Sequence, residues 1–285
     1  MPEASAHPTL AQCLAQANAL GVARLDAHML LLHSLGRSLH DRAWLLAHDT
    51  DLMNRAQQAA WQAALQRRLS GEPVAYITGY KEFFGLTLAV DARVLDPRAD
   101  TETLVDWALA VLPTPSPQPQ SLRILDLGTG SGAIALALQH SRPDTQVWAV
   151  DASEAALSVA RANAARLNLP VQFIASDWCT QVDGVFDLIV SNPPYIAQAD
   201  PHLAALRHEP QQALTSGADG LADLRRIVAQ AQPHLEPGGW LLLEHGFDQA
   251  EAVQSLLADA GFQPVQSRAD LAGHARCSGG QKPPK

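Results

Sequence analysis

The amino-acid sequence, 285 residues long, is poor in cysteine and has no long apolar run. Cys13, Cys179 and Cys277 are scattered and odd in number, which argues against both a disulfide framework and a zinc site and fits a reducing cytosol. No stretch approaches the ~20 uninterrupted apolar residues that span a bilayer. Residues 1–9 lack the basic start and the apolar run of a secretory signal. These absences predict a cytoplasmic protein with no membrane partner.

Clusters of positive charge are also missing. Lys and Arg total 20 against 29 Asp and Glu, a net charge of −9, and the longest basic runs are the pairs Arg67-Arg68 and Arg225-Arg226. A protein that holds nucleic acid needs a basic footprint, because neutralising phosphates supplies most of the affinity. The charge balance therefore disfavours direct nucleic-acid binding, although a local basic patch stays open.

The eleven histidines do not form a metal motif. No H-x-x-x-H or H-x-x-E-H spacing stands on a plausible helix. We interpret the histidines as surface or core residues and predict no metal site.

The length suits a core domain of about 180–200 residues with a smaller partner, and the 47% hydrophobic content is enough to bury a sizeable core. Apolar residues at helical spacing predict four short amphipathic helices, over residues 10–20, 22–35, 40–47 and 54–69. These helices predict a small bundle, which we assign to residues 1–73. It contains no residue that points to catalysis.

The pattern changes after the bundle, and we assign residues 74–99 to a linking β-hairpin. Residues 83–90 and 93–95 are the expected strands, around a turn at Asp91-Ala92. Asp100-Thr101 can cap a helix that runs to about residue 112. The alternating prolines of residues 113–119 predict a stiff surface connection.

Strands and helices alternate through the rest of the chain, residues 100–285. Strands are predicted over residues 123–127, 146–151, 171–176, 186–191 and 240–244, with helices running to 139 and over 153–167, 222–235 and 248–260. This alternation predicts an α/β fold with a doubly wound, parallel sheet. Ligands of such sheets bind at the carboxyl ends of the strands.

A glycine-rich loop leaves the first of these strands, and its residues are Asp126, Leu127, Gly128, Thr129, Gly130, Ser131 and Gly132. The loop also satisfies a loose dinucleotide-binding pattern. However, Asp126 would repel a pyrophosphate and would attract the ammonium group of a methionine moiety. Alternating glycines leave room for a nucleoside and a sulfonium. The pattern therefore favours S-adenosyl-L-methionine, while a glycine turn without a ligand is the alternative.

Two further strand ends carry side chains suited to a nucleoside. Asp151 ends the next strand, where it can accept hydrogen bonds from both ribose hydroxyls. Asp177-Trp178 follows the third strand, where an acid and an aromatic face can hold an adenine ring. For Trp178, packing in the core is an equally strong interpretation.

The fourth strand runs into Asn192-Pro193-Pro194-Tyr195. Two prolines end the strand and offer carbonyl acceptors without N–H donors. If the Asn192 Oδ1 and the Pro193 carbonyl accept both hydrogens of a substrate NH₂ group, a delocalised nitrogen is biased towards a nucleophilic geometry. Tyr195 can stack on the planar group, and methyl transfer then depends on positioning. The alternative is a loop that merely terminates the strand.

With these residues in hand, the sequence resembles the HemK/PrmC family, the protein-(glutamine-N5) methyltransferases of peptide chain release factors. The motifs that carry the resemblance follow in the family's order, namely residues 71–79, 82–86, 100–102, 126–132, 177–178, 192–195, 209–210 and 241–246. The resemblance implies a Rossmann-like class I methyltransferase domain with a mostly parallel, seven-stranded sheet. It also implies that the N-terminal bundle helps to dock a class 1 release factor.

The resemblance assigns roles to the residues already singled out. Gly128 to Gly132, Asp151, Trp178 and Asn192 would bind S-adenosyl-L-methionine, and Asn192 to Tyr195 would hold the glutamine of a Gly-Gly-Gln motif. The Asn-Pro-Pro-Tyr sequence is shared with adenine-N6 methyltransferases, which leaves a nucleic-acid amine methyltransferase as the alternative function. A cofactor-binding scaffold without catalysis would lack the residues of the acceptor loop, by which we mean Asn192 to Tyr195, but these residues are all present.

The chain departs from the family's pattern at three places. Asp96 stands where the family usually has an apolar residue and Ala99 where it has proline, and we expect both to loosen the exit of the hairpin without affecting the chemistry. The chain also carries Gly279-Gly280-Gln281, where relatives usually have a basic residue after the glycines. Its likeness to the substrate motif is interpreted as a coincidence at a strand end.

Overall fold

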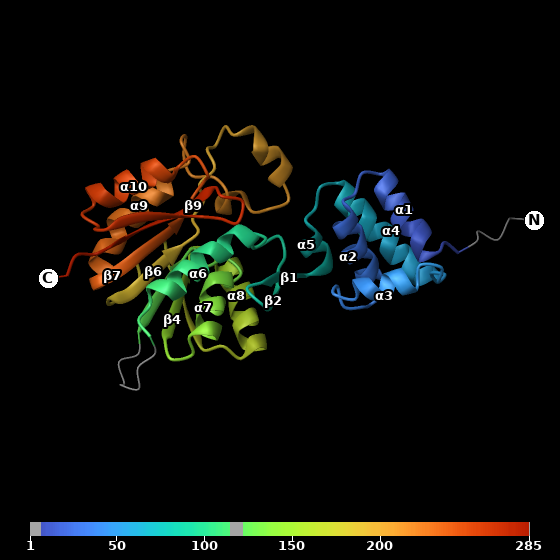
Figure 1. Ribbon diagram of the computed structural model, residues 1–285, viewed down its shortest axis with the longest axis horizontal. Coiled ribbons are helices and arrows are strands. Elements are labelled where there is room, and N and C mark those ends of the chain that lie inside the picture. The colour runs from blue at the N-terminus through green and yellow to red at the C-terminus, as the bar shows by residue number, and fades with distance from the viewer. Residues whose placement is uncertain (1–6, 115–121, 285) are drawn as a thin grey trace, which may run out of the picture. The chain divides into compact units, whose positions relative to one another are not determined.

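The structure, a computed structural model, describes residues 7–114 and 122–284. The chain divides into two compact units, an N-terminal unit up to Tyr80 and a C-terminal unit from Lys81 onwards, and Figure 1 shows the elements of each. Most of the proline-rich run predicted as a surface connection, residues 115–119, lies outside the described residues.

The N-terminal unit is helical, with the four predicted helices and one more. Its helices are α1 (Leu10–Ala19), α2 (Arg24–Ser34), α3 (Arg42–Ala47), α4 (Arg55–Leu69) and α5 (Val74–Thr78). Thr9 and Asn54 begin α1 and α4 with capping boxes, in which side chain and backbone exchange hydrogen bonds. Trp61 of α4 and Ile77 of α5 are buried in the same apolar core. The sequence analysis missed α5, a single short segment between Pro73 and the left-handed Gly79.

A two-stranded hairpin follows, and its turn differs from the predicted one. The strands are β1 (Tyr80–Phe83) and β2 (Leu86–Ala89). Phe84 and Gly85 form the turn, with φ of 48° and 74°, as a two-residue hairpin loop requires. The prediction of a turn at Asp91-Ala92 between two strands was therefore wrong. Asp91 does begin a turn, closed by Val94 N donating to its carbonyl over 3.1 Å, but residues 93–95 do not form the predicted strand.

The C-terminal unit is built on a seven-stranded sheet with the order β5-β4-β3-β6-β7-β9-β8. Neighbouring strands from β5 to β7 are parallel, whereas β9 is antiparallel to β7 and to β8. The strands are β3 (Arg123–Leu127), β4 (Gln146–Asp151), β5 (Val171–Ala175), β6 (Phe186–Ser191), β7 (Leu235–Glu244), β8 (Val265–Ala269) and β9 (Ala275–Gln281). This is the predicted doubly wound, mostly parallel fold, although β8 and β9 were not located from the sequence.

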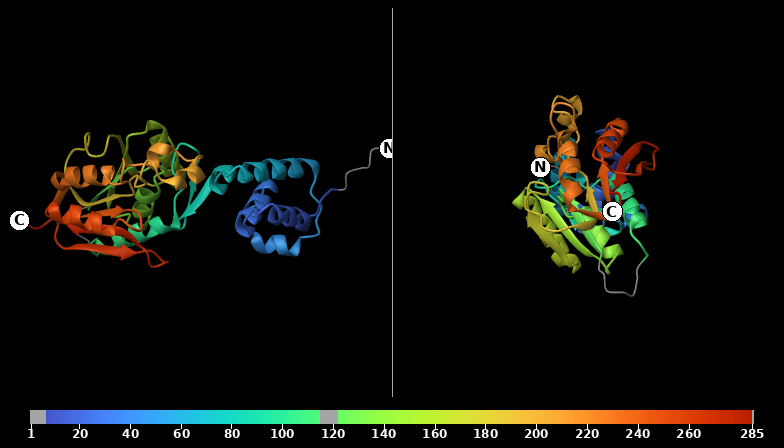
Figure 2. Two further views of the ribbon diagram at one scale, coloured as in Figure 1. Left: turned by 90° about the horizontal axis from the view of Figure 1, so that it is seen from above. Right: turned by 90° about the vertical axis from the view of Figure 1, so that its left-hand side faces the viewer.

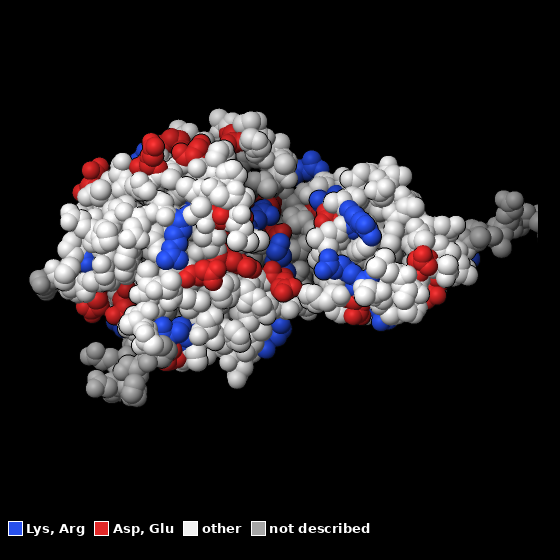
Figure 3. Space-filling model, viewed as in Figure 1, with Lys and Arg blue, Asp and Glu red and all other residues white. Residues whose placement is uncertain are grey.

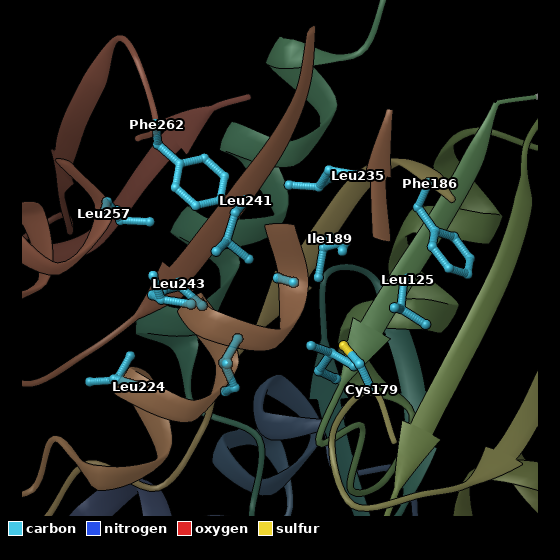
Figure 4. Packing of buried hydrophobic residues seen from close by; sticks show 14 of the residues in the cluster. Leu125, Cys179, Phe186, Ile189, Leu224, Leu235, Leu241, Leu243, Leu257 and Phe262 are labelled. Atoms are coloured by element: carbon cyan, nitrogen blue, oxygen red, sulfur yellow. The ribbon is translucent and has the colours of Figure 1, made fainter. Parts of the chain in front are cut away.

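Helices cover both faces of this sheet, as two views show (Figure 1, Figure 2). One face carries α6 (Glu102–Val111), α7 (Ala133–Ser141) and α8 (Glu154–Leu167), and the other carries α9 (Ala222–Ala231) and α10 (Ala250–Asp259). Alternate strand residues point to opposite faces, so Leu125, Ile189 and Leu241 pack towards α9 and α10 (Figure 4). Short 3₁₀ turns occur at η1 (Ala99–Thr101), η2 (Pro201–Leu206), η3 (Gln211–Ala213) and η4 (Gln232–His234).

The Gly-Gly-Gln sequence near the end of the chain belongs to β9. A Cβ at Gly279 would come within 2.8 Å of the Leu241 carbonyl, and one at Gly280 within 2.6 Å of the Phe262 Cβ, so the packing requires glycine at both positions. Gln281 pairs with Trp240, near the middle of β7 and four residues before the strand's carboxyl end. Its Nε2 donates to the Gly238 carbonyl over 2.7 Å. Close packing and strand pairing thus account for this sequence.

Candidate active site

A cavity lies where the carboxyl ends of β3, β4, β5 and β6 meet. The parallel register sets Leu127 beside Val150 and Ser191, so the loops that follow these strands come together. The cavity volume, about 350 Å³, falls in the ~300–1,000 Å³ range of small-molecule sites. It is lined by Arg93, Val94, Leu95, Gly128, Gly130, Asp151, Ala152, Ser153, Ala156, Ser176, Asp177, Trp178, Asn192, Pro194, Pro210, Gln212, Ala213, Asp223 and Arg226.

The glycine loop forms one wall of this cavity. Gly128, Gly130 and Gly132 all have positive φ, a conformation that costs an L-residue about 1–2 kcal/mol. The backbone N–H groups of Gly128 and Thr129 donate to the Val150 carbonyl over 2.9 and 2.8 Å, which ties the loop to β4. Gly128 and Gly130 line the cavity, whereas Thr129, Ser131 and Gly132 are not among its lining residues.

Asp126 lies beneath the loop and does not line the cavity. Its Oδ2 accepts hydrogen bonds from the Thr129 hydroxyl (2.6 Å) and the Ala135 N–H (3.2 Å), so it joins the loop to the first turn of α7. Its Oδ1 is buried without a hydrogen-bond partner. Burial raises the pKa of Asp126 to about 7. In this arrangement Asp126 supports the loop from below.

Asp151 combines a structural contact with exposure to the cavity. Its Oδ2 accepts from the Gly130 N–H and its Oδ1 from the Ser153 N–H, both over 2.9 Å. These bonds fix the carboxylate between the glycine loop and the start of α8. Burial raises the pKa of Asp151, although hydrogen bonds from the Ser153, Gly130 and Ala152 backbone oppose the shift. Each carboxylate oxygen has further lone pairs for the hydroxyls of a bound sugar.

Trp178 closes the side of the cavity next to Gly128. Its φ of +52° is rare for a bulky residue. A Cβ at Gly128 would lie 3.2 Å from the indole ring, so only glycine lets the ring approach the loop this closely. The indole N–H donates to the Asp223 Oδ1 over 3.3 Å. The neighbouring Asp177 is exposed and pairs with Arg226.

The Asn-Pro-Pro-Tyr loop occupies the end of β6. Asn192 and Pro194 line the cavity, while Pro193 is buried and Tyr195 is not a lining residue. The Asn192 Nδ2 donates to the Thr101 hydroxyl over 3.1 Å, which leaves the Oδ1 as the acceptor of this amide. Gln249 fixes Tyr195 through a 3.0 Å bond to its carbonyl. Burial raises the pKa of the Tyr195 phenol, so it stays neutral at physiological pH.

Several residues at the site escaped the sequence analysis. Asp223 and Arg226 reach the cavity from α9, and Thr101 and Glu244 lie behind Asn192. Asp223 also accepts from the Ser216 hydroxyl over 2.8 Å. These side chains are distant in sequence and meet only because the strands lie side by side. Thr101 and Glu244 do lie in motifs that carry the family resemblance, residues 100–102 and 241–246, and that was the signal that could have singled them out.

The departure at Asp96 tightens the chain where we expected it to loosen. Asp96 is buried and forms ion pairs with Lys81 (3.1 Å) and Arg98 (3.7 Å). Its backbone N–H donates to the Glu209 Oε2 over 3.3 Å, and Arg98 pairs with the other oxygen of Glu209. This network ties the segment after the hairpin to the segment that follows Tyr195. Ala99 begins the η1 turn, and nothing there indicates a loosened chain.

The described residues contain neither a metal-binding cluster nor a helix that could span a membrane. No group of three or more His, Cys, Asp or Glu side chains among residues 7–114 and 122–284 is arranged to hold a metal ion. Within the same part of the chain, every helix is too short or too polar to cross a membrane.

The fold and the site define a class I methyltransferase of the Rossmann-like type. Residues 101–260 match the family profile of the methyltransferase small domain. The hMettl16 catalytic domain, solved with the MAT2A 3′UTR hairpin 6, has the same fold, with a TM-score of 0.55 at 16% identity over 69% of this chain and 76% of that one.

Sequence comparison narrows this class to one family. Residues 9–79 match the PrmC N-terminal domain profile. The release factor glutamine methyltransferase of Bordetella pertussis is 52% identical over 91% of this chain and 95% of the relative. That of Burkholderia pseudomallei is 49% identical over 91% and 92%. The chain belongs to the release factor glutamine methyltransferase family.

Proposed function

We propose that this protein methylates the side-chain amide nitrogen, N5, of the glutamine in the Gly-Gly-Gln motif of class 1 peptide chain release factors. The methyl donor is S-adenosyl-L-methionine. The observation that carries the proposal is the Asn192-Pro193-Pro194-Tyr195 loop at the rim of a nucleoside-sized cavity, in a chain about half identical to proteins named for this activity.

The residues around the cavity fit this methyl donor. Asp151 would accept from the ribose hydroxyls, Gly128 and Gly130 would let the backbone approach the ligand, and Trp178 would hold the adenine with Asp177 at its edge. Asp126, Thr129, Ser131 and Gly132 would keep the loop in shape from behind. Bound there, the donor supplies an electrophilic methyl group.

The acceptor loop would activate an otherwise poor nucleophile. An amide nitrogen shares its lone pair with the carbonyl, so it gains nucleophilic character when both of its hydrogens are held out of the amide plane. The Asn192 Oδ1 is available for one hydrogen, because the Nδ2 of this side chain is engaged by Thr101. The Pro193 carbonyl would accept the other, and the neutral Tyr195 ring would pack on the planar amide. Positioning rather than a basic side chain would supply the rate.

The helical bundle would dock the release factor, with the hairpin and the segment up to residue 99 as a linker to the methyltransferase domain, residues 100–285. The bundle, predicted as residues 1–73, also includes α5, because Ile77 is buried in its core. Exposed large hydrophobic side chains support this division. Among the described residues, those in the N-terminal unit are Leu20, Leu25, Leu46, Leu52, Leu69 and Tyr80, against Phe247 and Leu271 in the C-terminal unit. Exposed apolar surface of this kind is common where proteins bind each other.

A nucleic-acid acceptor is the competing function. On the face shown in Figure 3, acidic and basic side chains are interspersed and no continuous basic stripe crosses the C-terminal unit. The net charge of −9 points the same way. We therefore propose a protein acceptor without direct nucleic-acid binding, and a cytoplasmic location, where translation terminates.

Radiolabelled methyl transfer tests the proposal. The full-length protein is incubated with labelled S-adenosyl-L-methionine and, separately, a release factor, DNA and RNA. We expect label on the release factor alone, and its loss when the motif glutamine is replaced by alanine. Label on nucleic acid and none on the release factor would reject the proposal.

A further inference from the structure

Glu244 ends β7 behind the acceptor loop and is fully buried. It has no role in the mechanism derived above. A buried carboxylate is costly unless it is hydrogen-bonded, yet its Oε2 has no hydrogen-bond partner. Its remaining partners are the side chains of Thr101 and Asn192, both of which hydrogen-bond to it. The free-energy cost of burying Glu244 next to the acceptor loop indicates that this carboxylate has a functional role.

The three side chains form one chain of hydrogen bonds. An ionised carboxylate only accepts hydrogen bonds, so the Thr101 hydroxyl donates to Glu244 and its oxygen is free to accept. The Asn192 Nδ2 donates to this oxygen over 3.1 Å. Both Thr101 and Glu244 therefore face the nitrogen end of the Asn192 carboxamide.

This arrangement matters because a carboxamide has two ends of nearly equal size. The end with oxygen would accept a hydrogen from the substrate amide, whereas the end with NH₂ would oppose it with a second donor. We propose that Thr101 and Glu244 are positioning residues that hold the Asn192 carboxamide with its oxygen towards the substrate nitrogen. The inference rests on the proposed function, because it concerns how that acceptor is held.

The ionisation of Glu244 decides in which direction the hydrogen bonds from Asn192 through Thr101 to Glu244 run. Burial raises the pKa of Glu244 to about 7. Once protonated, it can donate to Thr101, and the Thr101 hydroxyl can then donate to Asn192 and favour the opposite orientation of the carboxamide.

Other titratable groups surround Glu244. The charge of Arg276 favours its ionised form, whereas the charge of Asp100 opposes it. Tyr195 and Cys277 are also near, and burial raises the pKa of each. The adjacent His245 is buried, with its pKa lowered by burial.

The test uses the full-length protein with a release factor at saturating S-adenosyl-L-methionine. Thr101→Val keeps the shape of the side chain but removes the hydroxyl, and we expect kcat to fall roughly tenfold, as for one lost hydrogen bond in the transition state. Thr101→Ser restores the hydroxyl and should return kcat to within about threefold of the original enzyme. The cofactor dissociation constant and the thermal midpoint are measured for each variant, because a purely structural role would change them.

Glu244→Gln provides a second test that does not depend on the folding of the valine variant. For the unaltered protein we expect kcat to fall as pH drops below 7 and to level off at roughly one tenth of its plateau value, the loss expected for Thr101→Val. Glutamine has no ionisation in this range, so the profile of Glu244→Gln should be flat there. A kcat unchanged in Thr101→Val, or an acid limb that persists in Glu244→Gln, would overturn the positioning role. Absence of methyl transfer in the unaltered protein is a separate result, which rejects the proposed function and the inference together.

Discussion

Replacement of Asp151 by asparagine tests the ribose assignment. The carboxylate accepts one backbone N–H on each oxygen, from Gly130 and Ser153, at 2.9 Å. Asparagine keeps the volume, but its NH₂ group would oppose one of these donors and could not accept from a ribose hydroxyl. The loss of one charge-assisted hydrogen bond corresponds to ~1.5–3 kcal/mol, which raises the cofactor dissociation constant by roughly 10- to 150-fold.

Titration calorimetry at pH 8 measures this constant directly. Asp187→Asn is the matched control, because Asp187 also accepts a backbone N–H, from Arg123 over 2.7 Å, but lies near the start of β6, away from the cavity. We expect the control to lose some thermal stability and to bind the cofactor normally. A dissociation constant for Asp151→Asn within about twofold of the original value would refute the ribose assignment.

Three further predictions follow from the contacts at the site and from the exposed leucines. Gly128→Ala should lower thermal stability more than Gly130→Ala. Both variants lose about 1–2 kcal/mol because an alanine is forced into positive φ, but only the new Cβ at position 128 would contact the Trp178 ring, at 3.2 Å. Equal melting temperatures would contradict this. The pKa of Asp126 is about 7 in the folded protein, above its value in the unfolded chain. The protonated carboxyl therefore stabilises the folded state fully at low pH, and this stabilisation is lost as the pH rises through about 7. The free energy of unfolding of Asp126→Asn, relative to that of the unaltered protein, should therefore rise by on the order of a few kcal/mol between pH 4 and pH 8. Denaturant titrations measure it, and a difference that does not change with pH would count against the raised pKa. Leu20→Ser with Leu25→Ser, or Leu46→Ser with Leu52→Ser, should raise KM for a whole release factor and leave kcat/KM on a Gly-Gly-Gln peptide unchanged; if neither pair alters KM, the docking role of the bundle is wrong.

The parts of the site that are local in sequence were predictable. The glycine loop and Asn192 each come directly at the end of a strand, Asp151 is the last residue of one, and parallel strands bring their carboxyl ends to one edge. Thr101, Asp223 and Glu244 come from three separate elements and reach the site only through the strand order. Their roles depend on hydrogen bonds that a linear pattern does not encode.

The errors in the fold have equally specific causes. The apolar run of residues 83–90 hides a turn at Phe84-Gly85, since Phe84 is not a typical turn residue. The antiparallel strand β8 is mostly polar and partly exposed, so it lacks the alternation that indicates a strand. Glycine is depleted in strands generally, but close packing requires it at Gly279 and Gly280 of β9. The buried ion pairs of Asp96 depend on partners that the sequence does not place.

The central claim is methyl transfer to a glutamine side chain, and tandem mass spectrometry of the acceptor tests it most directly. A release factor is incubated with the protein and S-adenosyl-L-methionine, digested and sequenced by fragmentation. We predict one added methyl group on the glutamine of the Gly-Gly-Gln motif, absent when Asn192→Ala replaces the unaltered protein. A release factor that stays unmodified, or a methyl group on any other residue, would contradict the account.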